Sequence, residues 1–147
     1  MSTILFYVSF SRRSRDTETL MVAFKRQGHN VLFLNQQKNE QLHTLLRSHG
    51  ISVHSFSTGS KGWLKHVINV VHLSFFCWNN NVDFVYSHLE PASFIGVLAQ
   101  KFIRAKVYVC RHHGDLYSFM NRDKDLSYKI TYRFASNIIV VSESTKK

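Results

Sequence analysis

The sequence predicts a doubly wound α/β fold, a mostly parallel six-stranded sheet with helices on both faces. Apolar runs of strand length alternate regularly with longer segments of helical period. The strand-length runs are rich in β-branched and aromatic residues, which suits strands buried on both faces. Such β-α alternation implies parallel strands joined by right-handed crossovers.

The expected elements follow in order along the chain. The six predicted strands are Ile4–Val8, Val31–Leu34, Ile51–Phe56, Phe84–Tyr86, Val107–Cys110 and Ile138–Val141. Between them lie five predicted helices, Thr17–Gln27, Glu40–His49, Trp63–Cys77, Ala92–Ile103 and Leu126–Ala135. Gly28 and Gly50 follow the first two helices, where a C-terminal glycine is favoured, and Pro91 opens the fourth. With 147 residues and no linker composition, we expect a single domain.

The composition indicates which kinds of partner and which cellular location to expect. Lysine and arginine outnumber aspartate and glutamate by 19 to 9, giving +10 with neutral histidines, and such a charge favours anionic partners. No run of about 18 apolar residues marks a membrane span, and the start resembles a strand and not a signal peptide, so we expect a cytoplasmic protein. Cys77 and Cys110 match no zinc or disulfide spacing and are expected to be buried free thiols.

Ligands of open parallel sheets bind at the carboxyl ends of the strands, so the loops there are the candidate sites. The loop after the fifth strand is the richest in chemistry, with an arginine, two histidines, a flexible glycine and a carboxylate within five residues: Arg111, His112, His113, Gly114 and Asp115. Imidazole donates to sugar hydroxyls or phosphates near neutral pH. The alternative is structural, with one histidine and Asp115 capping local turns.

Two other loops carry candidates. His88 follows the fourth strand, where it is either a ligand contact or a partly buried histidine at a helix start. Arg12, Arg13 and Arg15 follow the first strand, where they either bind an anion beside a helix N-terminus or form a solvated basic loop. This loop lacks glycine, so no nucleotide-binding fingerprint is present. Histidine spacing does not support a metal site, and we expect none.

The third helix is amphipathic, with apolar residues at positions 64, 67, 68, 71 and 75 forming one stripe. We expect this helix to cover the sheet before the fourth strand. A membrane-surface helix, with Trp and Lys at the interface, is the alternative, and the two can hold for different faces of the helix.

Four segments together resemble the N-terminal domain of family 4 retaining glycosyltransferases of the GT-B fold. They are Lys-Arg-Gln-Gly-His-Asn-Val (25–31), Val-Asp-Phe-Val-Tyr-Ser-His (82–88), Val-Tyr-Val-Cys-Arg-His-His-Gly-Asp-Leu-Tyr (107–117) and Phe-Ala-Ser-Asn-Ile-Ile-Val-Val-Ser-Glu-Ser-Thr-Lys-Lys (134–147). They occur in the family's order on the expected strands, so the resemblance covers essentially the whole chain.

The resemblance implies an acceptor-side, Rossmann-like half of a two-domain transferase that uses a nucleotide sugar and no metal. His113, or alternatively His112, would contact the donor sugar, with Asp115 in support. Ser142 and Glu143 would line the interdomain cleft. The acceptor would be a glycan or a lipid-linked glycan of polysaccharide or glycolipid synthesis, and Arg12, Arg13, Arg15, His88 and Arg111 would bind it or its phosphate.

The sequence also departs from the family pattern. Arginines replace the glycine-rich first loop, which suggests an acceptor with its own negative charge, and the His-Gly-Asp spacing is one residue short. The donor-binding domain lies outside these 147 residues, so we expect the chain alone to bind no cofactor and to be inactive without that domain or a partner subunit.

Two alternative functions remain open. The chain is either half of a sugar-nucleotide epimerase, or a non-enzymatic basic module for an anionic membrane. A nucleic-acid partner is disfavoured, because no basic helix or aromatic-interleaved strand appears.

Overall fold

The structure, a computed structural model, describes residues 1–9, 14–111 and 122–140. Its core is one six-stranded sheet in the order β3-β2-β1-β4-β5-β6, and every pairing is parallel. The strands are β1 (Thr3–Val8), β2 (Asn30–Asn35), β3 (Ser52–Ser55), β4 (Phe84–His88), β5 (Lys106–Arg111) and β6 (Asn137–Val140). The predicted fold class is therefore confirmed, strand by strand.

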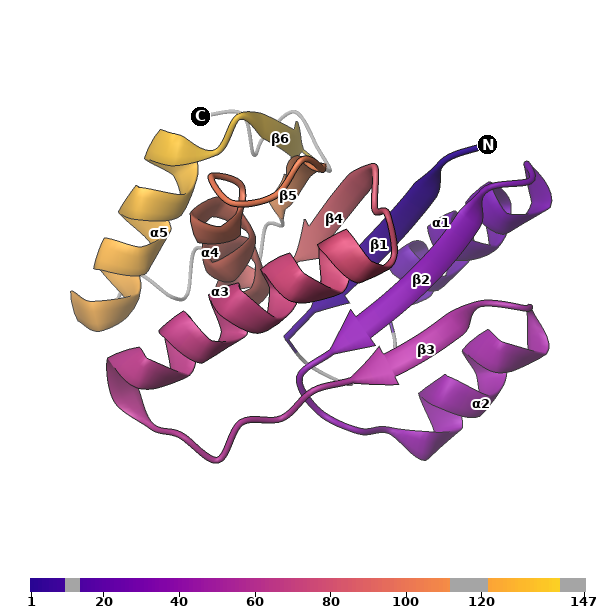
Figure 1. Cartoon of the computed structure of the whole chain (residues 1–147), viewed down its shortest axis with the longest axis horizontal. Coiled ribbons are helices and arrows are strands. Elements are labelled where there is room, and N and C mark those ends of the chain that lie inside the picture. Colours follow the sequence, from indigo (N-terminus) through magenta and orange to yellow (C-terminus); the bar gives the residue numbers. More distant parts are fainter. Residues whose placement is uncertain (10–13, 112–121, 141–147) are drawn as a thin grey trace.

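In the part of the chain that the structure describes, five helices cover the sheet. Figure 1 shows how they are arranged around it. They are α1 (Arg15–Arg26), α2 (Glu40–Ser48), α3 (Gly62–Asn79), α4 (Glu90–Ala99) and α5 (Arg122–Phe134). Alternate residues of each strand point to opposite faces, so the sheet has two cores. Residues of α1 and α2 pack on one core around Phe6 and Phe33, and residues of α3 and α4 pack on the other around Leu5 and Val85.

The observed helix ends agree with the glycine positions in the sequence. Gly28 and Gly50 follow α1 and α2 with φ of 85° and 71°, a left-handed conformation that glycine adopts without strain. At the start of α2, the Asn39 side chain accepts a hydrogen bond of 3.1 Å from the Leu42 backbone N–H. The fourth helix is shorter than expected, because the chain turns after Ala99.

The buried thiols are also as expected. Cys77 and Cys110 are both buried, and neither forms a disulfide within the described residues. Burial raises the pKa of the Cys77 thiol to about 12, so it stays protonated and unreactive at neutral pH.

Helix α3 covers the sheet as expected, but most of its apolar stripe does not face the sheet. Leu64, Val67, Val71 and Phe75 are exposed and Ile68 is half-buried, whereas the sheet is covered by the other side of the helix. That inner side is made of Asn69, Val70, Leu73, Ser74 and Cys77. Helical periodicity identifies the stripe but does not say which side of the helix meets the core.

Gly96 marks the closest approach of α4 to the sheet. A Cβ at this position would overlap the Ser87 hydroxyl and lie 3.3 Å from Ser87 Cβ and from Val107 Cγ1. We expect Gly96→Ala to lower the free energy of unfolding. Overpacking costs about 1–3 kcal/mol, which is more than the stabilisation that the higher helix propensity of alanine provides. Urea denaturation measures the change.

Ser87 offers a matched rescue of this substitution. Its Oγ is fully buried and has no hydrogen-bond partner within the described residues, so Ser87→Ala alone should be nearly neutral. The double variant Gly96→Ala/Ser87→Ala should recover most of the lost stability. A double variant no more stable than Gly96→Ala would show that the helix–sheet contact is not the cause.

Candidate functional site

The strand order predicts where a ligand would bind at one edge of the sheet. The order reverses between β1 and β4, so the connections that follow these strands leave in opposite directions. In the register, Val8 pairs with His88, and His88 pairs with Cys110. The carboxyl ends of β1, β4 and β5 therefore meet at one rim, with His88 in the middle.

His88 ends β4 and is 4% exposed. Its ring lies almost parallel to that of Tyr86, with 6.2 Å between the centroids. Burial, the neighbouring Cys110 thiol and the Asp16 carboxylate raise the pKa of Tyr86, so its phenol stays neutral. Helix α1 follows β1 in the chain, so its N-terminus lies at the edge of the sheet where β1 and β4 end.

Leu89 follows His88 directly and has an unusual backbone conformation. Its φ is 73° and its ψ is 152°, at the N-cap of α4. Such a conformation costs a non-glycine residue about 1–3 kcal/mol and is concentrated at functional sites. Within the described residues, Asn81 is the one other non-glycine residue with positive φ. The strain therefore points to the same rim.

Two further polar residues lie at the carboxyl ends of neighbouring strands. Ser9 follows β1 and is buried, and its Oγ has no hydrogen-bond partner in the described part of the chain. Asn35 ends β2, is fully buried, and donates from its amide to the Gln37 carbonyl. A buried hydroxyl without a partner normally costs free energy, so Ser9 is suited to hydrogen-bond a ligand at this rim.

The Tyr7 phenol and the Gln36 amide lie next to these groups. Gln36 Nε2 donates to Tyr7 Oη over 2.7 Å. Burial raises the pKa of Tyr7 to about 12, an increase that the hydrogen bond from Gln36 reduces. The phenol is therefore neutral at physiological pH. The rim offers hydroxyl, amide and imidazole groups, which suit sugar hydroxyls.

The structure locates three of the residues predicted from sequence. His88 lies in the rim, Arg111 ends β5 opposite Val140 of β6, and Arg15 is the exposed first residue of α1. The other predicted site residues lie outside the described residues: Arg12, Arg13, His112, His113, Asp115, Ser142 and Glu143. The positions expected for Arg12 and His113 at the strand ends therefore stay a prediction.

Ser9 and Leu89 were not singled out from the sequence. The position of Ser9 directly after a predicted strand was an available signal. For Leu89 no signal existed, because a positive φ is expected of glycine or asparagine.

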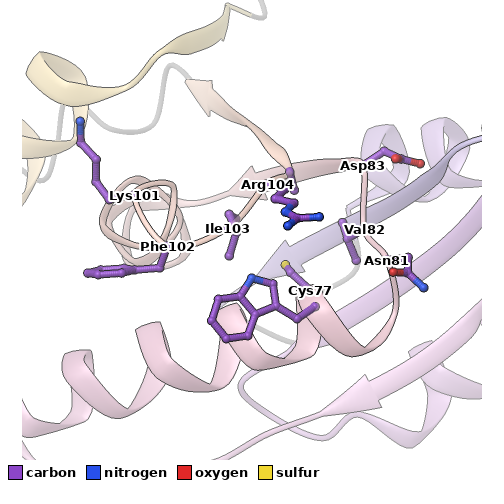
Figure 2. A pocket seen from close by; sticks show the side chains of 10 residues that line it. Cys77, Asn81, Val82, Asp83, Lys101, Phe102, Ile103 and Arg104 are labelled. Atoms are coloured by element: carbon purple, nitrogen blue, oxygen red, sulfur yellow. The ribbon is translucent and has the colours of Figure 1, made fainter.

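A cavity of about 620 Å³ lies away from this rim. It is lined by the end of α3 and the segments that lead into β4 and β5, including Asp83, Phe102 and Arg104 (Figure 2). These segments are at the amino ends of the strands, so the cavity lies at the opposite edge of the sheet. It is not part of the candidate site.

No group of three histidine, cysteine, aspartate or glutamate side chains is placed to hold a metal ion in residues 1–9, 14–111 and 122–140. Over the same ranges, no helix combines the length and apolar character needed to cross a bilayer.

Comparison with solved structures finds proteins of the same fold. The Anabaena protein Alr3699/HepE, solved with UDP and glucose, superimposes with a TM-score of 0.75 and 19% identity, over 99% of this chain and 39% of that one. S. aureus MnaA, solved with UDP, superimposes with a TM-score of 0.76 and 14% identity, over 99% of this chain and 40% of that one. Acinetobacter baumannii MurG superimposes with a TM-score of 0.70 and 13% identity, over 100% of this chain and 43% of that one. The chain therefore spans about two fifths of these proteins.

Sequence comparison identifies the family. No curated protein matches the chain. The profile of Glycosyltransferase Family 4, however, matches residues 14–147, which include every helix and strand except β1. From this match, the chain belongs to glycosyltransferase family 4.

Proposed function

We propose that the chain is the acceptor-side half of a retaining glycosyltransferase that uses a nucleotide sugar in polysaccharide or glycolipid synthesis. The family match over residues 14–147 carries this proposal. The chain spans about 40% of solved proteins with the same fold, which agrees with one domain of two. A donor-binding C-terminal domain, or a partner subunit, would supply the other half.

The rim at the carboxyl ends of β1, β4 and β5 is the proposed acceptor site. His88 and Ser9 would hydrogen-bond the acceptor from the sheet, and Arg15 and Arg111, with Arg12 and Arg13, would bind its negative charge. Buried polar groups discriminate strongly between ligands, because a ligand lacking the matching group leaves them unpaired.

The transfer step would be completed in the closed cleft between the two halves. His113, or alternatively His112, would reach the donor sugar, with Asp115 in support, and Ser142 and Glu143 would line the cleft. Closure excludes water and fixes the acceptor hydroxyl against the donor carbon, which supplies much of the rate. The proposed location is the cytoplasm, with peripheral attachment to the membrane that carries the acceptor.

An epimerase half is the second candidate. MnaA and a putative UDP-N-acetylglucosamine 2-epimerase from Listeria monocytogenes share the fold, the latter with a TM-score of 0.71 and 16% identity. At such identities the likeness supports the fold alone, whereas the family match favours the transferase. Binding of a glycan acceptor separates the two, because an epimerase needs none.

Calorimetric titration tests the proposal with short-chain prenyl-diphosphate saccharides and UDP-glucose as probes. We expect the chain to bind a saccharide probe, and His88→Ala to weaken that binding about tenfold, the loss of one hydrogen bond to a charged or polar ligand. His49→Ala is the matched control, because His49 is exposed at the end of α2, before β3 begins. Preferential binding of UDP-glucose, or equal effects of the two substitutions, would contradict the proposal.

A further inference from the structure

The solvent-facing side of α3 is a continuous apolar surface. It is formed by Trp63, Leu64, Val67, Val71, Phe75 and Trp78, and we call these residues the α3 face. Their exposures run from 45% for Val67 to 75% for Trp63. Spacings of three and four place them along one side of an 18-residue helix, roughly 27 Å long. Phe102, 62% exposed, lines the same cavity as Trp78 and extends the surface.

Unlike an ordinary surface helix, α3 is apolar on its exposed side as well as on its sheet-facing side, where Val70, Leu73 and Cys77 are buried. Its sheet-facing side buries Asn69 and Ser74, and Ser74 Oγ donates to the Val70 carbonyl over 2.8 Å. A helix of a soluble domain normally turns its apolar stripe inward. Contiguous exposed apolar surface of this kind marks a binding surface.

The charges around the α3 face are predominantly positive. Lys61 and Lys65 lie at the start of α3, and Lys101 and Arg104 line the cavity beside its end (Figure 2). The helix itself contains no aspartate or glutamate. Asp83 is the carboxylate of the cavity lining, and it already accepts a 2.7 Å hydrogen bond from the Thr3 N–H.

We propose that the α3 face docks the protein on an anionic lipid bilayer, with α3 lying in the interface. An apolar helix side with Trp at both ends matches the boundary between headgroups and acyl chains. Flanking lysines and arginine complement anionic headgroups. A second copy of the chain fits less well, because either orientation of two α3 faces would bring Lys61 and Lys65 against cationic residues of the other copy.

Docking along α3 also has a geometric consequence. The helix leads from the carboxyl end of β3 toward the amino end of β4, so Trp63 lies at the end of α3 nearer the acceptor rim. A bilayer at the α3 face would present a lipid-linked acceptor near that rim. This consequence rests on the proposed function, whereas docking itself rests on the α3 face alone.

Vesicle binding tests the proposal, and the chain provides its own probe. Trp63 and Trp78 are its two tryptophans, and both belong to the α3 face. We expect vesicles of phosphatidylcholine with 30% phosphatidylglycerol, roughly the charge of an anionic leaflet, to shift the tryptophan emission to the blue and to sediment the protein. Phosphatidylcholine alone should bind far less, and 0.5 M NaCl should weaken binding.

Substitutions assign the binding to the α3 face. Val71→Ser/Phe75→Ser should lower the partition coefficient at least about tenfold, because two buried apolar side chains are lost, and Lys61→Gln/Lys65→Gln should lower it about fivefold for each charge. The matched control is Leu126→Ser/Phe134→Ser, which alters two exposed apolar residues of α5 and should leave the partition unchanged.

Three outcomes would overturn the proposal. They are no binding to anionic vesicles, equal partition of the Val71→Ser/Phe75→Ser and control variants, and a concentration-dependent dimer that Val71→Ser/Phe75→Ser dissociates. Binding of a soluble saccharide probe should be the same in all these variants. Failure of docking is therefore distinguishable from failure of the proposed function.

Discussion

Alone, the chain should transfer no sugar above background from UDP-glucose, or from another nucleotide sugar, to a lipid-linked acceptor. The proposed acceptor rim lies at one edge of the sheet, and the chain spans about two fifths of the solved proteins that share its fold. Without a facing domain, neither orientation nor exclusion of water is achieved, and these effects account for roughly 7–11 kcal/mol of barrier lowering in well-oriented reactions.

A radiolabel transfer assay measures this result, with a two-domain member of the family as the positive control. Acceptor binding by the same preparation shows that the protein is folded and that its rim is intact. Sustained turnover by the chain alone would contradict the interpretation as half of an enzyme.

The second large effect concerns the side of α3 that meets the sheet. Leu73 is fully buried against the core, whereas Leu64, on the same helix, is 46% exposed. We expect Leu73→Ala to lower the free energy of unfolding by about 2–5 kcal/mol, since it removes core contacts and leaves a cavity. Leu64→Ala should change it by no more than about 0.5 kcal/mol.

Urea denaturation at constant m-value compares the two leucine variants directly. Because the substitution and the helix are the same, helix propensity cancels to a first approximation. A larger loss for Leu64→Ala would mean that the apolar stripe covers the sheet after all, and the membrane-docking proposal would lose its basis.

The sheet could be predicted from sequence because its strands are buried on both faces. Runs such as Val31–Leu34 are continuously apolar, and Gly28 and Gly50 end the helices between them. The orientation of α3 could not be predicted in this way. Its inner side holds Asn69 and Ser74, polar residues that periodicity assigns to solvent, and burial of Ser74 is tolerated because its hydroxyl bonds within the helix.

The location of the candidate site was predictable, but its details were less so. Parallel alternation alone places the ligand edge at the strand ends, and His88 is found there. The conformation of Leu89 depends on tertiary packing between β4 and α4, and no local sequence signal marks it. The buried state of Ser9 likewise follows from its neighbours and not from its own residue type.

Amide chemical-shift mapping with a prenyl-diphosphate saccharide tests the proposed acceptor site, because it reports where the acceptor binds. We expect the largest shifts at the carboxyl ends of β1 and β4, on Ser9, His88 and Leu89. Shifts centred instead on the cavity at the opposite edge, at Asp83 and Arg104, would contradict it.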